Sequence, residues 1–250
     1  MEKFIAQTGS YAIWQISTEN LYELAEFVVR ENYKHHVGRY TDEEIQAEID
    51  LVYQEELLYA DTSIAFLVRN LDGRTIGSIR IFKWDRHQTL PIQKLFGINP
   101  LTSIHAEEEY SYWHIGRFAI DSFAGISTLT LFKQLMVYAI HPIVQTEQSY
   151  MVAETDSKLL KVMNALGIQT TQLGESLNYL ASETIPVCSS REGLIPFYNR
   201  YKALLLASRF NMFLHSPLLC EFAPEKSFSH FCVTRGYFIK PYLCSAKCKK

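Results

Sequence analysis

The stretch that decides the fold is WHIGRFAID, residues 113–121. This short apolar run carries one histidine, His114, and one arginine, Arg117, and it breaks into Ser-Phe-Ala-Gly at residues 122–125 before a new helical pattern begins. Such an order predicts a strand that runs into a helix N-terminus, where backbone N–H groups can bind an oxyanion or a phosphate. Because an unpaired buried charge is costly, Arg117 needs a partner. The segment is therefore either a strand with a structural ion pair or the centre of an active site.

Strand and helix patterns alternate on both sides of this stretch. A capping box formed by Thr41 and Glu44 predicts the start of one helix, and Asp156 and Gly167 are expected to begin and end another. Residues 83–110 are expected to be irregular, because prolines interrupt them. The predicted strands cover residues 11–16, 63–69, 75–82, 112–121, 150–154, 177–180 and 185–188. The predicted helices cover residues 21–34, 41–57, 129–139, 156–166 and 192–214. This order predicts a mixed α/β sandwich.

Composition limits the classes of protein that fit. The chain has 250 residues, of which 48% are hydrophobic, enough for one domain over residues 1–200 with a C-terminal extension over 201–250. A net charge of −3 argues against a dedicated nucleic-acid binder. No apolar run is long enough for a transmembrane segment, and the N-terminus lacks the pattern of a secretory signal. The cysteines are odd in number and late in the chain, so we expect no disulfide framework and a cytoplasmic location.

Three short motifs carry a resemblance to a known family. They are Gly77-Ser78-Ile79-Arg80-Ile81, Leu90-Pro91-Ile92-Gln93-Lys94-Leu95-Phe96 and His114-Ile115-Gly116-Arg117-Phe118. The first resembles a third-strand pattern with arginine three positions after glycine, the second a Leu-Pro-x-x-x-x-Phe turn, and the third a fourth-strand Glu-x-x-Arg-Phe pattern. Together with the element order, they resemble the GNAT N-acyltransferases. Within that family they resemble the branch of acyl-homoserine lactone synthases and long-chain N-acyl amino acid synthases.

The resemblance covers about residues 10–200 and implies both a fold and an activity. The implied fold is a central mixed, mostly antiparallel sheet flanked by helices. The implied activity is that of an N-acyltransferase, which moves a fatty acyl group from an acyl-carrier-protein thioester to the amine of a small molecule such as an amino acid.

The loop after residue 120 departs from the GNAT acetyltransferase pattern. That pattern binds pyrophosphate with Arg/Gln-x-x-Gly-x-Gly/Ala, whereas residues 121–127 contain no basic residue and a single glycine. The missing cradle favours acyl carrier protein over acyl-CoA as the co-substrate, with no tightly bound cofactor. Met163 stands where many acetyltransferases place a tyrosine that protonates the thiolate. The candidates for binding the phosphopantetheine of the donor are Gly125, Ile126 and Ser127.

Acyl transfer to an amine needs a base and a stabilised oxyanion. His114 has an intrinsic pKa of about 6.5, which suits a base at neutral pH, although a strand histidine is also often a hydrogen-bonded core residue. Glu109, at the end of an acidic triplet, is a reserve base. The backbone N–H groups of Phe118, Ala119 and Ile120 are candidates for polarising the thioester carbonyl.

Arg80 and Arg117 are expected on neighbouring strands. There a guanidinium can grip a substrate carboxylate with two hydrogen bonds, or both arginines can form ion pairs that stabilise the fold. Regular alternation places Arg117 on the opposite face of its strand from His114, unless a bulge breaks the count. Aromatic residues can line an acyl tunnel but equally build a core. The aromatic candidates for the substrate site are Phe96, Trp113 and Phe132.

Two alternatives to carrier-dependent transfer stay open. One is an acetyltransferase that uses acetyl-CoA, and the other is a non-catalytic GNAT-like binding module. Residues 215–250 hold six basic and two acidic residues, which form either a solvated terminus or, with Lys34 and Arg39, a surface for an acidic carrier protein. The histidine and cysteine spacing over residues 230–248 fits no strong zinc pattern, so no metal is expected.

Overall fold

The computed structural model describes residues 1–34, 40–104, 109–179 and 182–205. The strands are β1 (Lys3–Gln7), β2 (Tyr11–Gln15), β3 (Ser63–Asn70), β4 (Thr75–Lys83), β5 (Ser111–Ile120), β6 (Ser149–Thr155), β7 (Thr171–Gln172), β8 (Leu177–Tyr179) and β9 (Ser182–Ser190). The helices are η1 (Thr18–Asn20), α1 (Leu21–Tyr33), α2 (Asp42–Tyr59), α3 (Pro91–Phe96), α4 (Pro100–Ser103), α5 (Thr128–Gln145), α6 (Ser157–Ala165) and α7 (Arg191–Tyr201).

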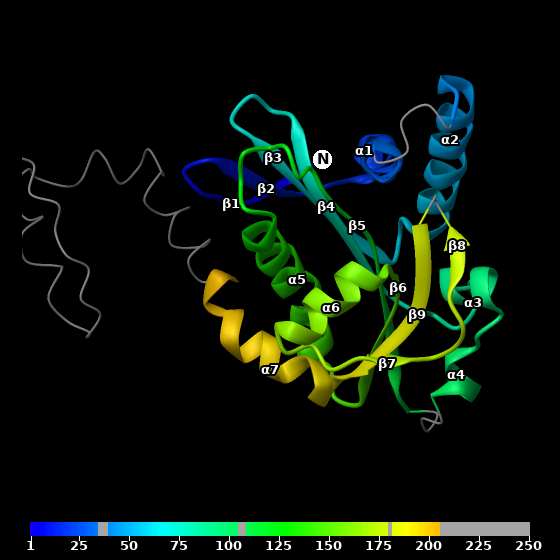
Figure 1. Cartoon of the computed structure of the whole chain (residues 1–250). Helices are drawn as coiled ribbons and strands as arrows, with labels where there is room; N and C mark the ends of the chain where they lie inside the picture. The colour runs from blue at the N-terminus through cyan, green and yellow to red at the C-terminus, as the bar shows by residue number, and fades with distance from the viewer. Residues whose placement is uncertain (35–39, 105–108, 180–181, 206–250) are drawn as a thin grey trace, which may run out of the picture. The chain divides into compact units, whose positions relative to one another are not determined.

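The described strands form one sheet in the order β1-β2-β3-β4-β5-β6-β9-β7, and β8 pairs with β9. Of the described strand pairs, β5 and β6 run parallel and the others run antiparallel. A parallel pair needs a crossover connection, which α5 supplies. In Figure 1, α5, α6 and α7 lie on one side of the sheet, and α1 and α2 lie on the other. The predicted mixed, mostly antiparallel sheet with helical cover is confirmed.

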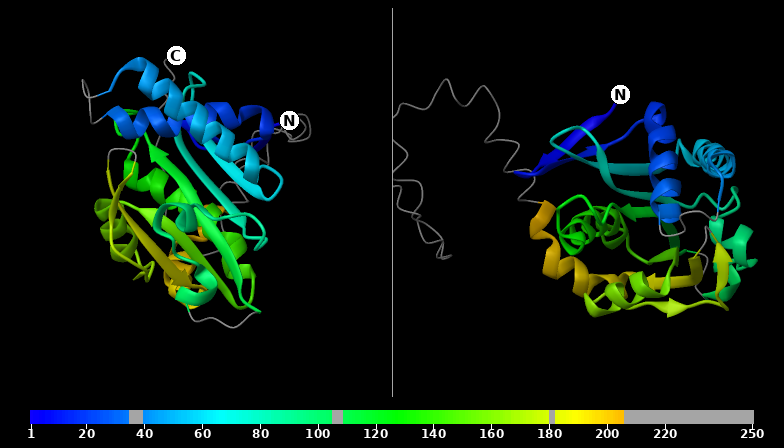
Figure 2. Two further views of the ribbon diagram at one scale, coloured as in Figure 1. Left: turned by 90° about the vertical axis from the view of Figure 1, so that its right-hand side faces the viewer. Right: turned by 45° about the horizontal axis from the view of Figure 1, so that its top comes forward.

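Alternation along the strands fills two apolar layers. Ile79, Ile81 and Ile115 are buried in the larger core with the apolar face of α5. On the opposite face, Leu67 packs with Leu24 of α1 in a smaller core. Both views of Figure 2 show α1 and α2 lying against each other above this second face. The two helices therefore bring polar residues of α2 close to the middle strands.

Local sequence signals predict most element positions correctly. The capping box exists, because the Thr41 side chain accepts from the Glu44 N–H and the Glu44 carboxylate accepts from the Thr41 N–H. Asp156 caps α6 through two backbone N–H groups, and Gly167 follows its end at a positive φ of 98°. The hairpin of β3 and β4 also lies where predicted.

Two predictions of secondary structure need correction. The segment expected to be irregular contains α3 and α4, since a proline at the first position of a helix suits helix initiation. The edge strand β1 and the two-residue strand β7 were not expected. The last helix begins at Arg191, close to the predicted start, but the structure describes the chain only to residue 205. The boundary of the extension at 201–250 stays a prediction.

A β-bulge in β5 changes which way Arg117 points. Arg80 pairs with Gly116, and Ser78 pairs with Ala119, so two residues of β5 lie opposite Ile79 alone. Arg117 takes a positive φ of 53°, which is costly for a residue with a Cβ. The Ser78 hydroxyl donates to the Arg117 carbonyl oxygen at 2.7 Å. The exception allowed for in the sequence analysis therefore applies: the extra residue breaks the alternation, and Arg117 lies on the same side of the sheet as His114.

Within the described ranges, every helix is too short or too polar to span a lipid bilayer.

Candidate active site

The sheet opens between β5 and β6. Their parallel pairing ends at Ile115 and Ala153, whereas β5 stays paired with β4 as far as Ile120. A cavity of about 520 Å³ lies at this opening. One part of its wall is apolar and includes the buried methionines Met136, Met151 and Met163. Another part carries charged residues of α2, β4, β5 and β6. The cavity thus joins an apolar compartment to a charged one beside unpaired strand edges.

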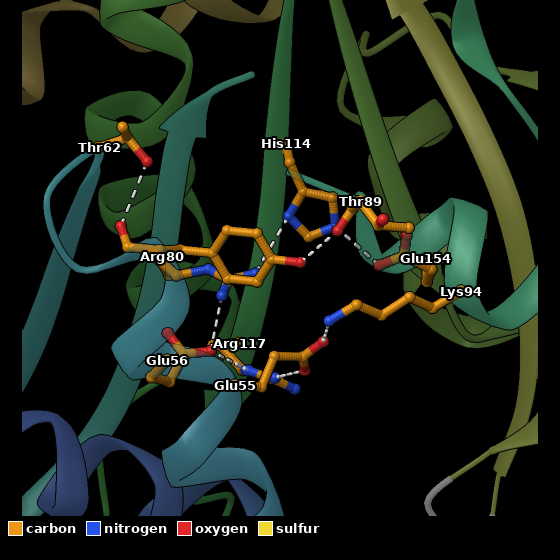
Figure 3. A network of polar contacts seen from close by, with 10 residues as sticks. Glu55, Glu56, Thr62, Arg80, Thr89, Lys94, His114, Arg117 and Glu154 are labelled. Carbon is orange, nitrogen blue, oxygen red and sulfur yellow. Dashed lines mark hydrogen bonds and ion pairs between the residues drawn. The ribbon is translucent and has the colours of Figure 1, made fainter. Parts of the chain in front are cut away.

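A chain of polar contacts crosses the charged part of the cavity (Figure 3). Its centre is Glu56, whose Oε1 accepts from Arg80 at 2.6 Å and from Arg117 at 2.7 Å. Glu55 binds the other end of the Arg117 guanidinium and also accepts from Lys94 at 3.2 Å. At the opposite end, Arg80 contacts His114. Opposite charges therefore alternate along the chain from Lys94 to Arg80.

Burial and charge compete at the centre of this network. Glu56 is fully buried, and burial alone would raise the pKa of its carboxyl. The guanidinium groups of Arg80 and Arg117 outweigh burial and hold the pKa of Glu56 below its ordinary value. Burial likewise opposes the charge of Arg117, but Glu56 and Glu55 raise its pKa. Glu56 and Arg117 are consequently charged at neutral pH.

The contacts of His114 fix its tautomer. Arg80 lies 3.2 Å from His114 Nδ1, and a guanidinium only donates, so Nδ1 is the acceptor. Nε2 then carries the proton and donates to Glu154 Oε2 at 2.9 Å. Gly116 leaves room for the ring, because a Cβ there would lie 2.7 Å from His114 Cε1. With its lone pair occupied by Arg80, His114 is poorly placed to act as the base expected from the sequence.

Both arginines are brought together as expected, but neither has a free pair of donors for a substrate. Arg80 is 1% and Arg117 9% exposed, and each is bound by protein carboxylates. A bidentate grip on a substrate carboxylate would have to displace a buried ion pair, which is strongly unfavourable. Arg30, by contrast, forms a surface pair with Glu26 four residues earlier. Arg80 and Arg117 therefore form ion pairs within the protein, which was the second of the two roles considered for them, and Glu56 is the partner that they share.

The register of β5 orients the candidate oxyanion donors. The Asp121 N–H donates to the Ile76 carbonyl oxygen of β4. Alternation then turns the Ala119 N–H toward β4 as well, while the N–H group of Ile120 points to the opposite edge. That edge is the one β6 has left. Of the three expected amides, Ile120 faces the opening and Ala119 faces β4, while Phe118 belongs to the bulge.

Solved structures share this arrangement of elements. The AHL synthase LasI matches with a TM-score of 0.50 at 18% sequence identity, over 80% of this chain and 94% of that one. FeeM, an N-acyl amino acid synthase from uncultured soil microbes, matches with 0.51 at 18% identity, over 80% and 97%. TofI, in a ternary complex with an inhibitor and MTA, matches with 0.51 at 12% identity, over 79% and 95%. The chain has the GNAT fold.

No protein-family model matches the chain, and no curated protein matches it either. At 12–18% identity, the likeness to solved structures establishes the shared GNAT fold and leaves the activity to the site itself.

The aromatic candidates lie outside the cavity wall of this GNAT fold. Phe132 is buried in the core, where its ring meets Phe118 at 5.5 Å. Trp113 packs against the same core, on the α5 side of the sheet. Phe96 packs in a separate cluster that includes Trp84. The structure brings none of the three expected substrate-binding aromatics to the cavity, because all three complete apolar cores instead.

The loop expected to bind phosphopantetheine connects β5 to α5 but does not line the cavity. Ser127 caps α5 by accepting from the Thr130 N–H, and Gly125 has a positive φ of 71°. Ile126 packs against the larger core. At the start of the loop, the carboxylate of Asp121 is 2% exposed and pairs with Lys34 and Arg74.

Of the remaining candidate residues, some lie far from the cavity and others lie outside the described residues. Glu109 is exposed in a turn before β5, at the opposite end of that strand from the opening, so strand length separates it from the site. Arg39 and the basic tail lie outside the described residues, as do the late histidine and cysteines. Cys188 is buried and free. Among the described residues, no cluster of His, Cys, Asp or Glu has the arrangement of a metal site.

Three site residues escaped the sequence prediction: Glu55, Glu56 and Glu154. Glu56 had a detectable signal, because it continues the helical spacing of Ile49 and Val52 on the buried face of α2. A carboxylate on such a stripe needs a buried cation. Glu154 had no such signal, because the sequence does not tell which face of β6 meets the opening.

We predict that Glu56→Gln lowers the free energy of unfolding by about 3–5 kcal/mol at pH 7, because two buried arginines lose their shared anion. Glu26→Gln, which breaks a surface pair, is the control and should cost less than about 0.5 kcal/mol. The lowered pKa of Glu56 stabilises the fold above pH 4.5, and this stabilisation is lost as the pH falls below that value. Urea unfolding between pH 7 and pH 3 measures both effects. Equal losses in the two variants, or a difference that does not depend on pH, would contradict the account.

Proposed function

We propose that this protein is an N-acyltransferase that moves a fatty acyl group from a thioester to the amine of a small molecule. The observation that carries the proposal is the cavity at the opening between β5 and β6, which joins an apolar compartment to a charged one. The apolar tail of a thioester would contact the apolar part of the wall there, and a polar amine acceptor would contact the charged part. Two proteins with this fold bear the names AHL synthase and N-acyl amino acid synthase, which agrees with an N-acyl product.

The apolar compartment suits an acyl chain. Met136, Met151 and Met163 are each at most 3% exposed, and all three line the cavity. Methionine side chains are unbranched and adaptable, so they can pack against chains of different length. By the resemblance to the GNAT acetyltransferases, Met163 stands where many of them place a tyrosine, so the chain would offer an apolar contact there instead of an acid.

The thioester carbonyl would lie at the edge of β5. The N–H groups of Phe118 and Ile120 would donate to its oxygen as negative charge develops on attack by the amine. One such donor is typically worth about 10²–10³ in rate. The bulge at Arg117 supports this role, because it keeps β5 paired with β4 while leaving its other edge open.

We propose that the donor is an acyl carrier protein. Residues 121–127 contain no basic residue, so they offer no side chain to an adenosine diphosphate group. Lys34 and Arg74, which are 38% and 59% exposed, both pair with Asp121 at the start of this loop, and the side chain of Phe123 in the loop is exposed. Such a surface fits an acidic protein partner better than a nucleotide.

Cells that overproduce this chain are predicted to accumulate new N-acyl products, which mass spectrometry of lipid extracts would detect. With purified protein, transfer should be faster from acyl carrier protein than from acyl-CoA, and calorimetry should detect no tight binding of free CoA. Tight CoA binding with efficient use of acyl-CoA would favour the acetyltransferase alternative. If neither donor supports transfer to any amine of a broad panel, the binding-module alternative is correct.

The acceptor preference follows from the paired arginines. Because Arg80 and Arg117 are bound by Glu56, an acceptor gains little from a free carboxylate. Glu48, which lines the same wall, has no ion-pair partner among the described residues, and burial raises the pKa of its carboxyl. We predict that an amino acid methyl ester is acylated with a kcat/KM at least about 10-fold above that of the free amino acid. Matched pairs of acid and ester with one donor test this, and a preference for the acids would contradict it.

A further inference from the structure

We propose that Glu154 is the general base of the transfer, and that His114 is a positioning residue that orients it. This inference rests on the proposed function, because it assigns the group that accepts the proton of the acceptor ammonium. The position of Glu154 is the first argument. Glu154 follows Ala153, the last residue of β6 that pairs with β5, so it lies where the two strands part. Its side chain lines the cavity.

The hydrogen bonds of the carboxylate are the second argument. His114 Nε2–H donates to Glu154 Oε2, while Glu154 Oε1 is buried and has no hydrogen-bond partner among the described residues. The side chain is 11% exposed, so water gives it little compensation. A buried carboxylate oxygen without a hydrogen bond is stabilised when it gains a donor, and an N–H group of the acceptor ammonium can be that donor.

The other carboxylates of the wall are less suited to accept a proton. Glu55 and Glu56 are bound by guanidinium groups, and these cations hold the pKa of each carboxyl below its ordinary value despite burial. Asp156 also lines the cavity, but its Oδ1 accepts from two N–H groups at the start of α6. Glu48 is the other rival, but it lies on α2 and not on the strands that form the opening. Glu154 therefore combines a free oxygen with a position at the reacting atoms.

His114 holds Glu154 in place because His114 is itself held. Arg80 donates to Nδ1, and the Arg80 guanidinium lies between Glu56 and the imidazole. The ring also stacks on Phe82 at 5.1 Å between centroids. With Nδ1 bound to a permanent cation, a second proton on His114 would place two positive charges in contact. His114 therefore accepts at Nδ1 and donates through Nε2.

The proton balance of the step is complete with these groups. Glu154 Oε1 accepts one proton from the acceptor ammonium, and the resulting neutral amine forms the C–N bond at the thioester carbonyl. The C–S bond then breaks, and the second amine proton leaves with the sulfur as a thiol. The products are an amide, a thiol and a protonated Glu154, which returns its proton to solvent.

The test compares Glu154→Gln with Glu183→Gln, the same change on the neighbouring strand β9 at a residue outside the cavity wall. The substrates are a fatty acyl carrier thioester and an amino acid methyl ester that the wild type acylates. At pH 7, Glu154→Gln should lower kcat by about 10²–10⁴, and Glu183→Gln should leave it unchanged. The deficit of Glu154→Gln should shrink above a pH of about 8, where an α-amino group loses its proton unaided.

His114 variants distinguish positioning from a merely structural role. His114→Gln keeps an N–H donor and should retain more activity than His114→Phe, which has none. In His114→Phe, the acidic limb of the pH–rate profile should move to higher pH, because the carboxylate loses a hydrogen bond that favours its ionised form. Nitrogen chemical shifts of the imidazole should report a protonated Nε2 and an unprotonated Nδ1 in the wild type, whatever the substrate.

Several outcomes would overturn the inference while leaving acyl transfer intact. They are a Glu154→Gln variant within about threefold of wild-type kcat, a larger loss in Glu48→Gln than in Glu154→Gln, or a His114 protonated at Nδ1. If Glu154→Gln is not folded by circular dichroism, Glu154→Asp takes its place. This variant should lose rate but keep the wild-type pH profile, and a changed profile would count against the inference. Absence of transfer by the wild type would instead refute the proposed function.

Discussion

The site depends on one carboxylate oxygen. Oε1 of Glu56 binds Arg80 and Arg117 at once, and so ties α2 to the two central strands. Burying three charges costs desolvation energy, so this cluster adds more to the definition of the structure than to its stability. The bulge turns Arg117 to the side of the sheet opposite the one that regular alternation predicts, and Glu56 is its partner on that side. The ion pairs offset the cost of the positive φ at Arg117 and thereby maintain the bulge beside the opening.

The same contacts settle which groups remain available for chemistry. Arg80 is held by Glu56 and in turn engages His114, which removes the imidazole lone pair from the cavity. The proton on the other nitrogen is directed at Glu154. The buried charge cluster is therefore connected by hydrogen bonds, through His114, to Glu154 at the edge of β6. The apolar methionine wall lies next to this edge, so an acyl chain and an amine would meet where the amides of β5 are exposed.

The sequence predicts those parts of the molecule that depend on local contacts. The β3–β4 hairpin follows from the turn chemistry around Gly73, and the start of α2 follows from the capping box at Thr41. Arg80, His114 and Arg117 were recognisable as polar residues in apolar strands. The sequence left the bulge only as an alternative to regular alternation, because it depends on the contacts of Ser78 and Glu56, which are distant in sequence. Glu154 and the apolar wall emerge only once β6 and α6 are placed, which is why the aromatic candidates were chosen instead.

The most direct test of this account is a crystal structure of the protein with a thioether analogue of an acyl-pantetheine, which cannot react. The account predicts that the pantetheine arm enters between β5 and β6, that the acyl chain lies among Met136, Met151 and Met163, and that the group replacing the thioester lies beside the Phe118 and Ile120 amides. An analogue bound elsewhere, with the opening between β5 and β6 unoccupied, would contradict it.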